Sequence, residues 1–377
     1  MYSVLSYGQM ASDGVRIDAY ARAIEKAVRP GSVVVDLGAG TGIMSLLALR
    51  AGARRVHAVE LDPAIWLARD VAVANGYEDR FVVHHGSSFD LELEERADVI
   101  VADLRGSSPL FGLNVAAIED AKRRLLSPAG VLVPKRDRLF VALAETAVHR
   151  RELERGWTSF ERRGFDGTAA RSATLNCVYF DENDAIHSNH VVSDAKAWAD
   201  VLYGEPFTRA LTGSVSLAVR RAGVAHALVV WFEATLSDGV VFDNAPGSSL
   251  VYKRIVLPLL DPVPVSAGDT AHITLRTDVI GDQWAWDTEI AAGPRVRQAT
   301  FLGQPANPAS FLRESLAATP SKNLEGDRAA RVLAMMDGNH TVGAITEDAL
   351  STAAGFSSTR RDAVSDEVKS CVRRYSR

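Results

Sequence analysis

The sequence predicts an α/β domain with a mostly parallel sheet, then an antiparallel β-barrel or sandwich, and a small helical segment at the C-terminal end. Three observations support this prediction. Strand-like and helix-like stretches alternate between residues 32 and 134, which is typical of crossover units in a parallel sheet. Short apolar or alternating runs separated by Gly, Asp and Pro follow, as in antiparallel sheets. From about Asn307 the composition shifts to polar helical segments.

Length and composition set the broad class of protein. A chain of 377 residues with 47% hydrophobic side chains can bury two sizeable cores. We expect domains at residues 1–136, 137–305 and 306–377. The net charge of −5 gives no broad attraction to phosphate backbones, so we expect no nucleic-acid partner. No signal-like N-terminus and no run of about 18 apolar residues occurs, so we expect a cytoplasmic protein without a membrane partner.

The first domain opens with an amphipathic helix over residues 15–28, which ends at Pro30-Gly31. Five strands are predicted after it, at SVVVDL, RVHAVEL, FVVHHG, DVIVADL and VLVP. Helices are predicted between them at IMSLLALRAG, PAIWLARDVAVANG and VAAIEDAKRRLL. Pro134 marks the end of this domain.

The second domain is predicted from the runs RLFVALAET, VSLAVRR, AHALVVWFEATL, YKRIVLPLL and HITLRTDV. Residues 147–166 interrupt these strands with charged helical sequence. Trp157, Phe160 and Phe165 lie in this insertion. We therefore expect an arm that packs against another surface.

A glycine-rich turn, Gly38-Ala39-Gly40-Thr41-Gly42, follows the first predicted strand and opens a helix. Glycine lets the backbone turn sharply and approach a ligand, and Asp36 can bond an ammonium group or a bridging water. Glu60 ends the next strand, where its carboxylate can accept both hydroxyls of a ribose. The turn lacks the GxGxxG spacing that brings a pyrophosphate to a helix N-terminus. These features favour a phosphate-free nucleoside ligand over the alternative, a plain strand-to-helix turn with a solvated Glu60.

With their neighbours, these motifs resemble class I S-adenosylmethionine-dependent methyltransferases, and within them the protein arginine methyltransferase family, over about residues 7–300. The likeness to the family's helix before its first motif lies in Met10, Asp13, Val15, Arg16 and Tyr20. Residues 226–232 are similar to the barrel strand after the dimerisation arm, and residues 157–166 to part of that arm. The resemblance implies a Rossmann-like domain of the seven-stranded type and a homodimer formed through an arm at about residues 147–176.

The resemblance also implies S-adenosylmethionine as cofactor, with S-adenosylhomocysteine as product. Arg16 would pair with the methionyl carboxylate, Glu60 would hold the ribose, and Ser88 or Phe89 would lie along the adenine. The full set of expected cofactor-binding residues is Met10, Arg16, Asp36, Gly38, Ala39, Gly40, Thr41, Gly42, Glu60, Leu61, Ser88, Phe89 and Asp103.

The chain departs from that family at the acceptor site. Two family glutamates that grip a guanidinium fall on Asp103 and Gly112. A later family histidine falls near residues 250–252 and is missing, and the histidine beside the cofactor falls on Tyr7. Because the five donors of a guanidinium form a planar fork that suits two carboxylates, this pocket is a poor arginine site.

Methyl transfer from a sulfonium chiefly requires that donor and nucleophile are held in line. An amine acceptor must also arrive unprotonated or lose its proton to a carboxylate or water. We therefore predict N-methylation of an amine on a peptide or protein, with Asp103, Tyr7 and Tyr252 as catalytic residues and Asp103 orienting or deprotonating the nucleophile. The alternatives are arginine methylation with another acid such as Glu119, and a non-catalytic scaffold. The retained cofactor motifs argue against the scaffold.

The remaining polar residues receive structural interpretations. We expect Arg105 to face solvent rather than an acidic substrate group, and His226 to be a satisfied core histidine. His84-His85 and His340 lack partners at metal-ligand spacing, so we expect no metal.

Residues 328–350 resemble the small winged-helix modules that hold leader peptides in peptide-modifying pathways. The resemblance implies a ribosomally made peptide as substrate. The alternative is an ordinary helical appendage that covers the barrel or makes a dimer contact.

Overall fold

A computed structural model of the chain describes residues 2–106, 108–110, 112–182, 184–207, 210–278, 283–305, 317–351 and 358–376. The chain forms two compact units, Met1–Pro305 and Ala306–Arg377. Among the described residues, no helix is long and apolar enough to cross a bilayer.

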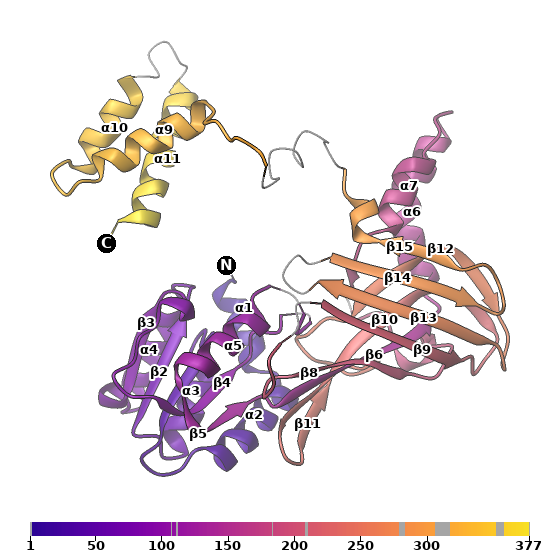
Figure 1. Ribbon diagram of the computed structural model, residues 1–377, viewed down its shortest axis with the longest axis horizontal. Coiled ribbons are helices and arrows are strands. Elements are labelled where there is room, and N and C mark those ends of the chain that lie inside the picture. The colour runs from indigo at the N-terminus through magenta and orange to yellow at the C-terminus, as the bar shows by residue number, and fades with distance from the viewer. Residues whose placement is uncertain are drawn as a thin grey trace. The chain divides into compact units, whose positions relative to one another are not determined.

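The N-terminal part of the first unit contains a parallel five-stranded sheet in the order β3-β2-β1-β4-β5 (Figure 1). Its strands are β1 (Val33–Leu37), β2 (Arg55–Glu60), β3 (Phe81–His85), β4 (Ala97–Ala102) and β5 (Leu126–Val133). This confirms the predicted α/β class. The described sheet has five strands and not seven, because the next strand, β6 (Arg136–Ala144), pairs with strands of the second sheet.

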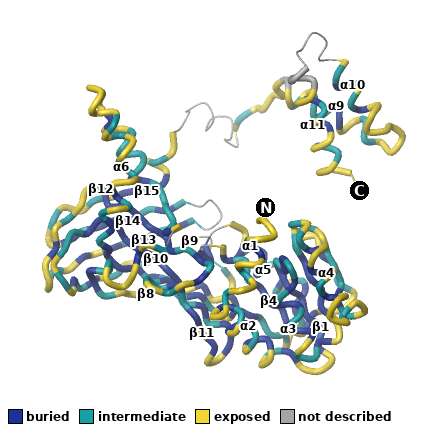
Figure 2. The backbone as a smooth tube through the Cα atoms, turned by 180° about the vertical axis from the view of Figure 1, so that it is seen from behind, coloured by how far each residue is buried: buried dark blue, intermediate teal, exposed yellow. Residues whose placement is uncertain are grey.

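Helices flank this sheet, and the apolar run VVVDL of β1 is buried along its whole length (Figure 2). The helices are α1 (Val4–Ala11), α2 (Gly14–Ala27), α3 (Ile43–Arg50), α4 (Ala64–Ala74) and α5 (Asn114–Arg124), with short 3-10 turns at Glu78–Arg80 and Ser88–Asp90. Because parallel strands are covered on both faces, such buried runs are expected at the sheet centre. The carboxyl ends of β1, β2 and β4 lie side by side.

The rest of the first unit is antiparallel, as predicted. One sheet has the order β7-β12-β10-β6-β8 with β11 beside β10, and the other has the order β15-β14-β13-β9. The strands are β7 (Tyr179–Phe180), β8 (Lys196–Leu202), β9 (Ala210–Ala218), β10 (Gly223–Ser237), β11 (Val240–Asp243), β12 (Ile255–Val265), β13 (Thr270–Asp278), β14 (Gln283–Ile290) and β15 (Val296–Ala299), with 3-10 turns at Ser188–His190 and Thr300–Gly303.

The predicted interruption of these strands consists of two helices, α6 (Ala147–Glu161) and α7 (Thr168–Leu175), which project from the barrel (Figure 1). The Trp157 indole N–H donates to the Thr174 hydroxyl at 2.7 Å and joins the two helices. Arg150 is buried and donates to the carbonyls of Leu259 and Leu260 on β12, which anchors the base of α6.

In residues 317–351 and 358–376 the second unit has three helices, α9 (Leu324–Met335), α10 (Val342–Ser351) and α11 (Ser358–Tyr375). They share a small apolar core that consists of Val332, Ile345, Ala349, Val364 and Val368. No strand occurs at residues 317–351 or 358–376, so any wing of the predicted winged helix lies outside the described residues. Residues 306–316 of the predicted third domain also lie outside them.

Candidate cofactor and acceptor site

The glycine-rich turn connects β1 to α3 at the carboxyl edge of the parallel sheet. Gly40 has φ 53°, and a Cβ there would lie 2.8 Å from Cε1 of Tyr7. Gly42 has φ 86°, and a Cβ there would lie 2.9 Å from Cβ of Ala68. Both positions therefore require glycine for backbone conformation and for close packing. Ala39 and Thr41 lie between them in the same turn.

Two of the predicted acids lie beside this turn. Glu60 accepts the Gly40 N–H through Oε2 and the Asp62 N–H through Oε1, both at 2.9 Å. Asp36 is buried and accepts the Ser45 hydroxyl at 2.6 Å. Burial raises the pKa of Asp36 to about 6, because the hydrogen bond from Ser45 offsets only part of the lost hydration.

Arg16 and Tyr252 converge on Asp103 at the end of β4. Arg16 Nε lies 2.5 Å from Oδ2 of Asp103, and the Tyr252 hydroxyl lies 2.6 Å from both carboxylate oxygens. Arg16 Nη1 also donates to the Met10 carbonyl at 2.8 Å. The structure thus brings together four of the predicted site residues, Met10, Arg16, Asp103 and Tyr252.

Burial alone would raise the pKa of Asp103, but the guanidinium groups of Arg16 and Arg105 outweigh it and hold the pKa below its ordinary value. Its side chain is 5% exposed and accepts hydrogen bonds from Arg16, Arg105 and Tyr252. A carboxylate with these partners is stable in its ionised form and is a weak proton acceptor.

Arg105 is a correction to the sequence prediction, because it does not face solvent. Its side chain is 1% exposed and lies against the rings of Phe232 and Phe242. Its guanidinium makes two hydrogen bonds to Asp137, at 2.8 and 3.0 Å. The partner Asp137 lies 32 residues further along the chain, on β6, so no local signal in the sequence revealed the pair.

Tyr7 lies against Gly40 from α1 and is buried. Burial raises the pKa of Tyr7, and the nearby carboxylates of Glu60 and Asp62 raise it further, so the phenol stays neutral. Tyr7 therefore lies beside the glycine-rich turn.

Two of the residues expected to bind the cofactor have exposed side chains. Leu61 is 72% exposed and Phe89 is 40% exposed. The 3-10 turn that carries Ser88 and Phe89 is held by Arg124 of α5, which donates to the Ser88 carbonyl at 2.8 Å and to the Leu91 carbonyl at 2.7 Å. Sequence reasoning missed this arginine.

Neither Gly112 nor Glu119 brings a second carboxylate to Asp103. Gly112 is exposed and has φ 63°. Glu119 does not approach Asp103; its carboxylate accepts the N–H of Phe207, in the segment after β8, at 3.3 Å. No second carboxylate from these two positions therefore faces the acceptor site.

The histidines are placed as structural groups. His226 is buried and its Nδ1 accepts the Thr146 N–H at 3.3 Å. His57 and His84 lie side by side with ring nitrogens 2.9 Å apart, and burial lowers the pKa of both. In the part of the chain that the structure describes, no group of three or more His, Cys, Asp or Glu side chains is placed to hold a metal ion.

The sequence and the fold match known proteins. The family model for ribosomal protein L11 methyltransferase (PrmA) matches residues 20–139. The chain is 29% identical over 309 residues to protein arginine N-methyltransferase 6 of Danio rerio, covering 74% of this chain and 88% of the relative. It is 36% identical over 136 residues to probable protein arginine N-methyltransferase 6 of Arabidopsis thaliana, of which it spans only 31%. That shorter match covers 36% of this chain.

Among solved structures, the Trypanosoma brucei PRMT1 enzyme-prozyme heterotetrameric complex with AdoHcy superposes with a TM-score of 0.70. The match has 21% identity and covers 78% of this chain and 96% of that one. Sequence and fold place the chain among the class I S-adenosylmethionine-dependent methyltransferases. This confirms the predicted fold class, the predicted enzyme class and its cofactor, and the resemblance to the arginine methyltransferases.

Proposed function

We propose that this methyltransferase transfers the methyl group of S-adenosylmethionine to a nitrogen of a peptide or protein side chain. The supporting observation is that the glycine-rich turn with Glu60, and the pair of Arg16 and Asp103, lie at the neighbouring carboxyl ends of β1, β2 and β4. Glu60 would accept the ribose hydroxyls, and Arg16 would pair with the methionyl carboxylate. Protein substrates are also what the names of the arginine methyltransferase relatives indicate for those proteins.

The acceptor in this proposal is an amine. Asp103 is already bonded to two arginines and a tyrosine, and Gly112 supplies no carboxylate, so a guanidinium would find no two-acid clamp. Arginine methylation is the second candidate, and the similarity to arginine methyltransferases favours it. In either case Tyr7 and Tyr252 would border the acceptor, and Asp103 would orient Arg16 and Tyr252.

The test is methyl transfer to a matched pair of peptides that differ only in a single lysine or arginine. Mass spectrometry after incubation with S-adenosylmethionine should find one added methyl group on the amine-bearing peptide and none on the arginine peptide. Methylation of the arginine peptide alone would replace the leading proposal with the second candidate.

Cofactor binding is tested separately from methyl transfer. A ligand that binds only the native state stabilises it by RT ln(1 + [L]/Kd). Millimolar S-adenosylhomocysteine should therefore raise the melting temperature of the protein. An unchanged melting temperature would contradict the proposed cofactor site.

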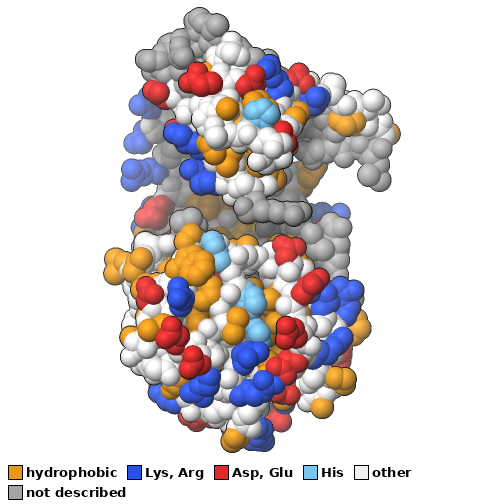
Figure 3. Space-filling model, turned by 90° about the vertical axis from the view of Figure 1, so that its left-hand side faces the viewer, with side chains coloured by type: hydrophobic (Ala, Val, Ile, Leu, Met, Phe, Trp, Pro, Cys, Tyr) orange, Lys and Arg blue, Asp and Glu red, His pale blue; other side chains and the backbone are white. Residues whose placement is uncertain are grey.

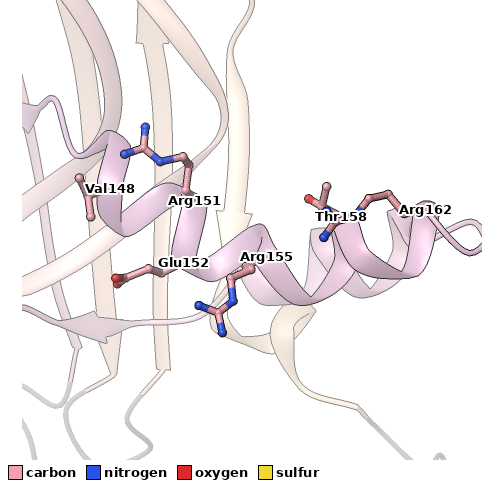
Figure 4. A pocket seen from close by; sticks show the side chains of 6 residues that line it. All are labelled: Val148, Arg151, Glu152, Arg155, Thr158 and Arg162. Carbon is pink, nitrogen blue, oxygen red and sulfur yellow. The ribbon is translucent and has the colours of Figure 1, made fainter.

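A homodimer formed through α6 and α7 is part of the proposal. One side of α6 carries Val148, Arg151, Glu152, Arg155, Thr158 and Arg162 around a hollow of about 440 Å³ (Figure 4). The exposed side of α4 carries the apolar Trp66 and Val73, with Arg69 and Asp70 between them. In the proposed dimer, this side of α6 in one copy packs against the exposed side of α4 in another.

The C-terminal unit would bind part of the peptide substrate, as its resemblance to leader-binding modules implies. A cytoplasmic location belongs to the same proposal. Acidic and basic side chains are interspersed on the face seen in Figure 3, which agrees with a partner other than nucleic acid.

A further inference from the structure

Four buried side chains form a row of alternating charge from the barrel to the cofactor pocket. Asp137 on β6 pairs with Arg105, Arg105 pairs with Asp103, and Asp103 pairs with Arg16. The three contacts are 2.8, 3.1 and 2.5 Å. Only the last pair is adjacent to the proposed cofactor.

Arg105, inside the row, is fully enclosed. Arg105 Nη1 donates to the Tyr20 hydroxyl at 2.6 Å as well as to Asp103, and the Phe232 and Phe242 rings cover the guanidinium at 5.6 and 5.8 Å. Every nitrogen of this guanidinium therefore has a hydrogen-bond acceptor. Its orientation is fixed by partners from both the parallel sheet and the barrel.

Asp137 is equally constrained. Its side chain is 0% exposed and accepts the Tyr203 hydroxyl at 2.6 Å in addition to Arg105. The Tyr203 oxygen accepts an N–H of Asn114 on α5 at 3.2 Å. Through these bonds the row is connected to β6, to the segment after β8 and to α5.

Burying charged side chains costs desolvation free energy, so a buried ion pair is weak evidence for a stabilising role. A row of such pairs that ends at Arg16 therefore suggests a role in ligand binding. Arg16 Nη2 has no hydrogen-bond partner among the described residues, while Nε and Nη1 are held by Asp103, Tyr252 and Met10. We infer that Arg105 and Asp137 are positioning residues that fix Asp103, and through it direct the free edge of Arg16 toward the methionyl carboxylate. This inference rests on the proposed function.

The simplest competing explanation is that the row only joins the two parts of the first unit. A joining role would affect stability and the binding of every ligand. A positioning role would affect only ligands that carry the carboxylate. The two roles are therefore separated by comparing S-adenosylhomocysteine with methylthioadenosine, which keeps the adenosine but lacks the amino-acid part.

The experiment measures both affinities by calorimetry in the full-length chain. Tyr203→Phe removes one hydrogen bond to Asp137, and the paired variant Arg105→Met/Asp137→Leu removes both charges so that neither stays buried alone. Loss of support for a charge-assisted contact should weaken S-adenosylhomocysteine about five- to twentyfold in the paired variant and less in Tyr203→Phe. Methylthioadenosine should bind within about twofold of the wild type in both.

Val256→Ala, a buried position on β12 outside the row, is the control for lost stability and should change neither affinity. Equal weakening of both ligands, or unchanged S-adenosylhomocysteine affinity in both variants, would overturn the inference. If the paired variant does not fold, Tyr203→Phe decides alone. Wild-type protein that binds neither ligand would overturn the proposed function itself.

Discussion

Arg16 Nε lies 2.5 Å from Oδ2 of Asp103, and this contact joins the helix before the first strand to the end of the fourth parallel strand. Both side chains are buried. Asp103 also accepts hydrogen bonds from Arg105 and Tyr252, so both of its carboxylate oxygens are already bonded to side chains of the protein. The contact therefore supports a role in cofactor binding more strongly than a role in proton removal.

Asp103→Asn tests this role. The amide keeps the shape of the carboxylate but removes the charge that orients Arg16, so S-adenosylhomocysteine affinity should fall about tenfold. Calorimetry of the wild type and the variant measures the change. If Asp103 were instead a general base, cofactor affinity would be unchanged and only the rate of methyl transfer would fall.

Gly40→Ala should damage both the turn and the position of Tyr7. At φ 53° a Cβ costs about 1–2 kcal/mol, and here it would also lie 2.8 Å from the tyrosine ring. We expect a lower free energy of unfolding in urea and weaker S-adenosylhomocysteine binding.

Two further variants complete this test. Gly8→Ala is the control, because its Cβ would meet no atom within 4 Å. In a Tyr7→Ala background the cost of Gly40→Ala should be smaller, since part of the clash is removed. Equal costs in both backgrounds would show that the ring contact contributes nothing.

Much of this site could be predicted from the sequence because its residues follow strand ends. Asp36, Glu60 and Asp103 belong to β1, β2 and the end of β4, and parallel strands bring such ends to one edge. The assignment of Gly112 to the position of a family glutamate rests on an ungapped count along residues 102–128 and stays a prediction.

The contacts that close the site were not predictable in this way. Arg105 was expected in solvent, because its partner Asp137 lies in a charged stretch that reads as a polar strand start. The strand β8 was missed for a related reason: its buried residues Trp198 and Val201 are three positions apart, because a register shift in the pairing with β6 interrupts the alternation. Both depend on pairings between distant segments, which periodicity does not reveal.

Cofactor affinity should depend on pH through Asp36. Its pKa in the folded protein is raised to about 6, so the carboxyl holds a proton at pH 5 and is ionised at pH 7.5. An ionised Asp36 attracts the ammonium group of the cofactor, so S-adenosylhomocysteine affinity should fall as the pH drops through about 6.

The raised pKa of Asp36 also makes the stability of the fold depend on pH. The raised pKa makes ionised Asp36 unfavourable in the unliganded fold, so its contribution favours folding below the unfolded pKa and is lost as the pH rises through about 6. Asp36→Asn should therefore flatten both profiles. Calorimetry at pH 5 to 8 measures the pH dependence of S-adenosylhomocysteine affinity, and urea unfolding over the same range measures that of stability. An affinity profile that is unchanged in Asp36→Asn would assign the pH dependence to another group.

The basic side of α6 should decide the oligomeric state. Arg151, Arg155 and Arg162 line one side of the helix, and we expect this side to contact an acidic and apolar surface on a second copy. The triple variant with glutamate at these positions would meet like charges, so the dimer should dissociate. Light scattering should find about 81 kDa for the wild type, twice the chain mass of 40.6 kDa, and the chain mass for the variant. The matched triple lysine variant keeps the charge and should stay dimeric. A wild type that is monomeric at micromolar concentration would contradict the proposed dimer.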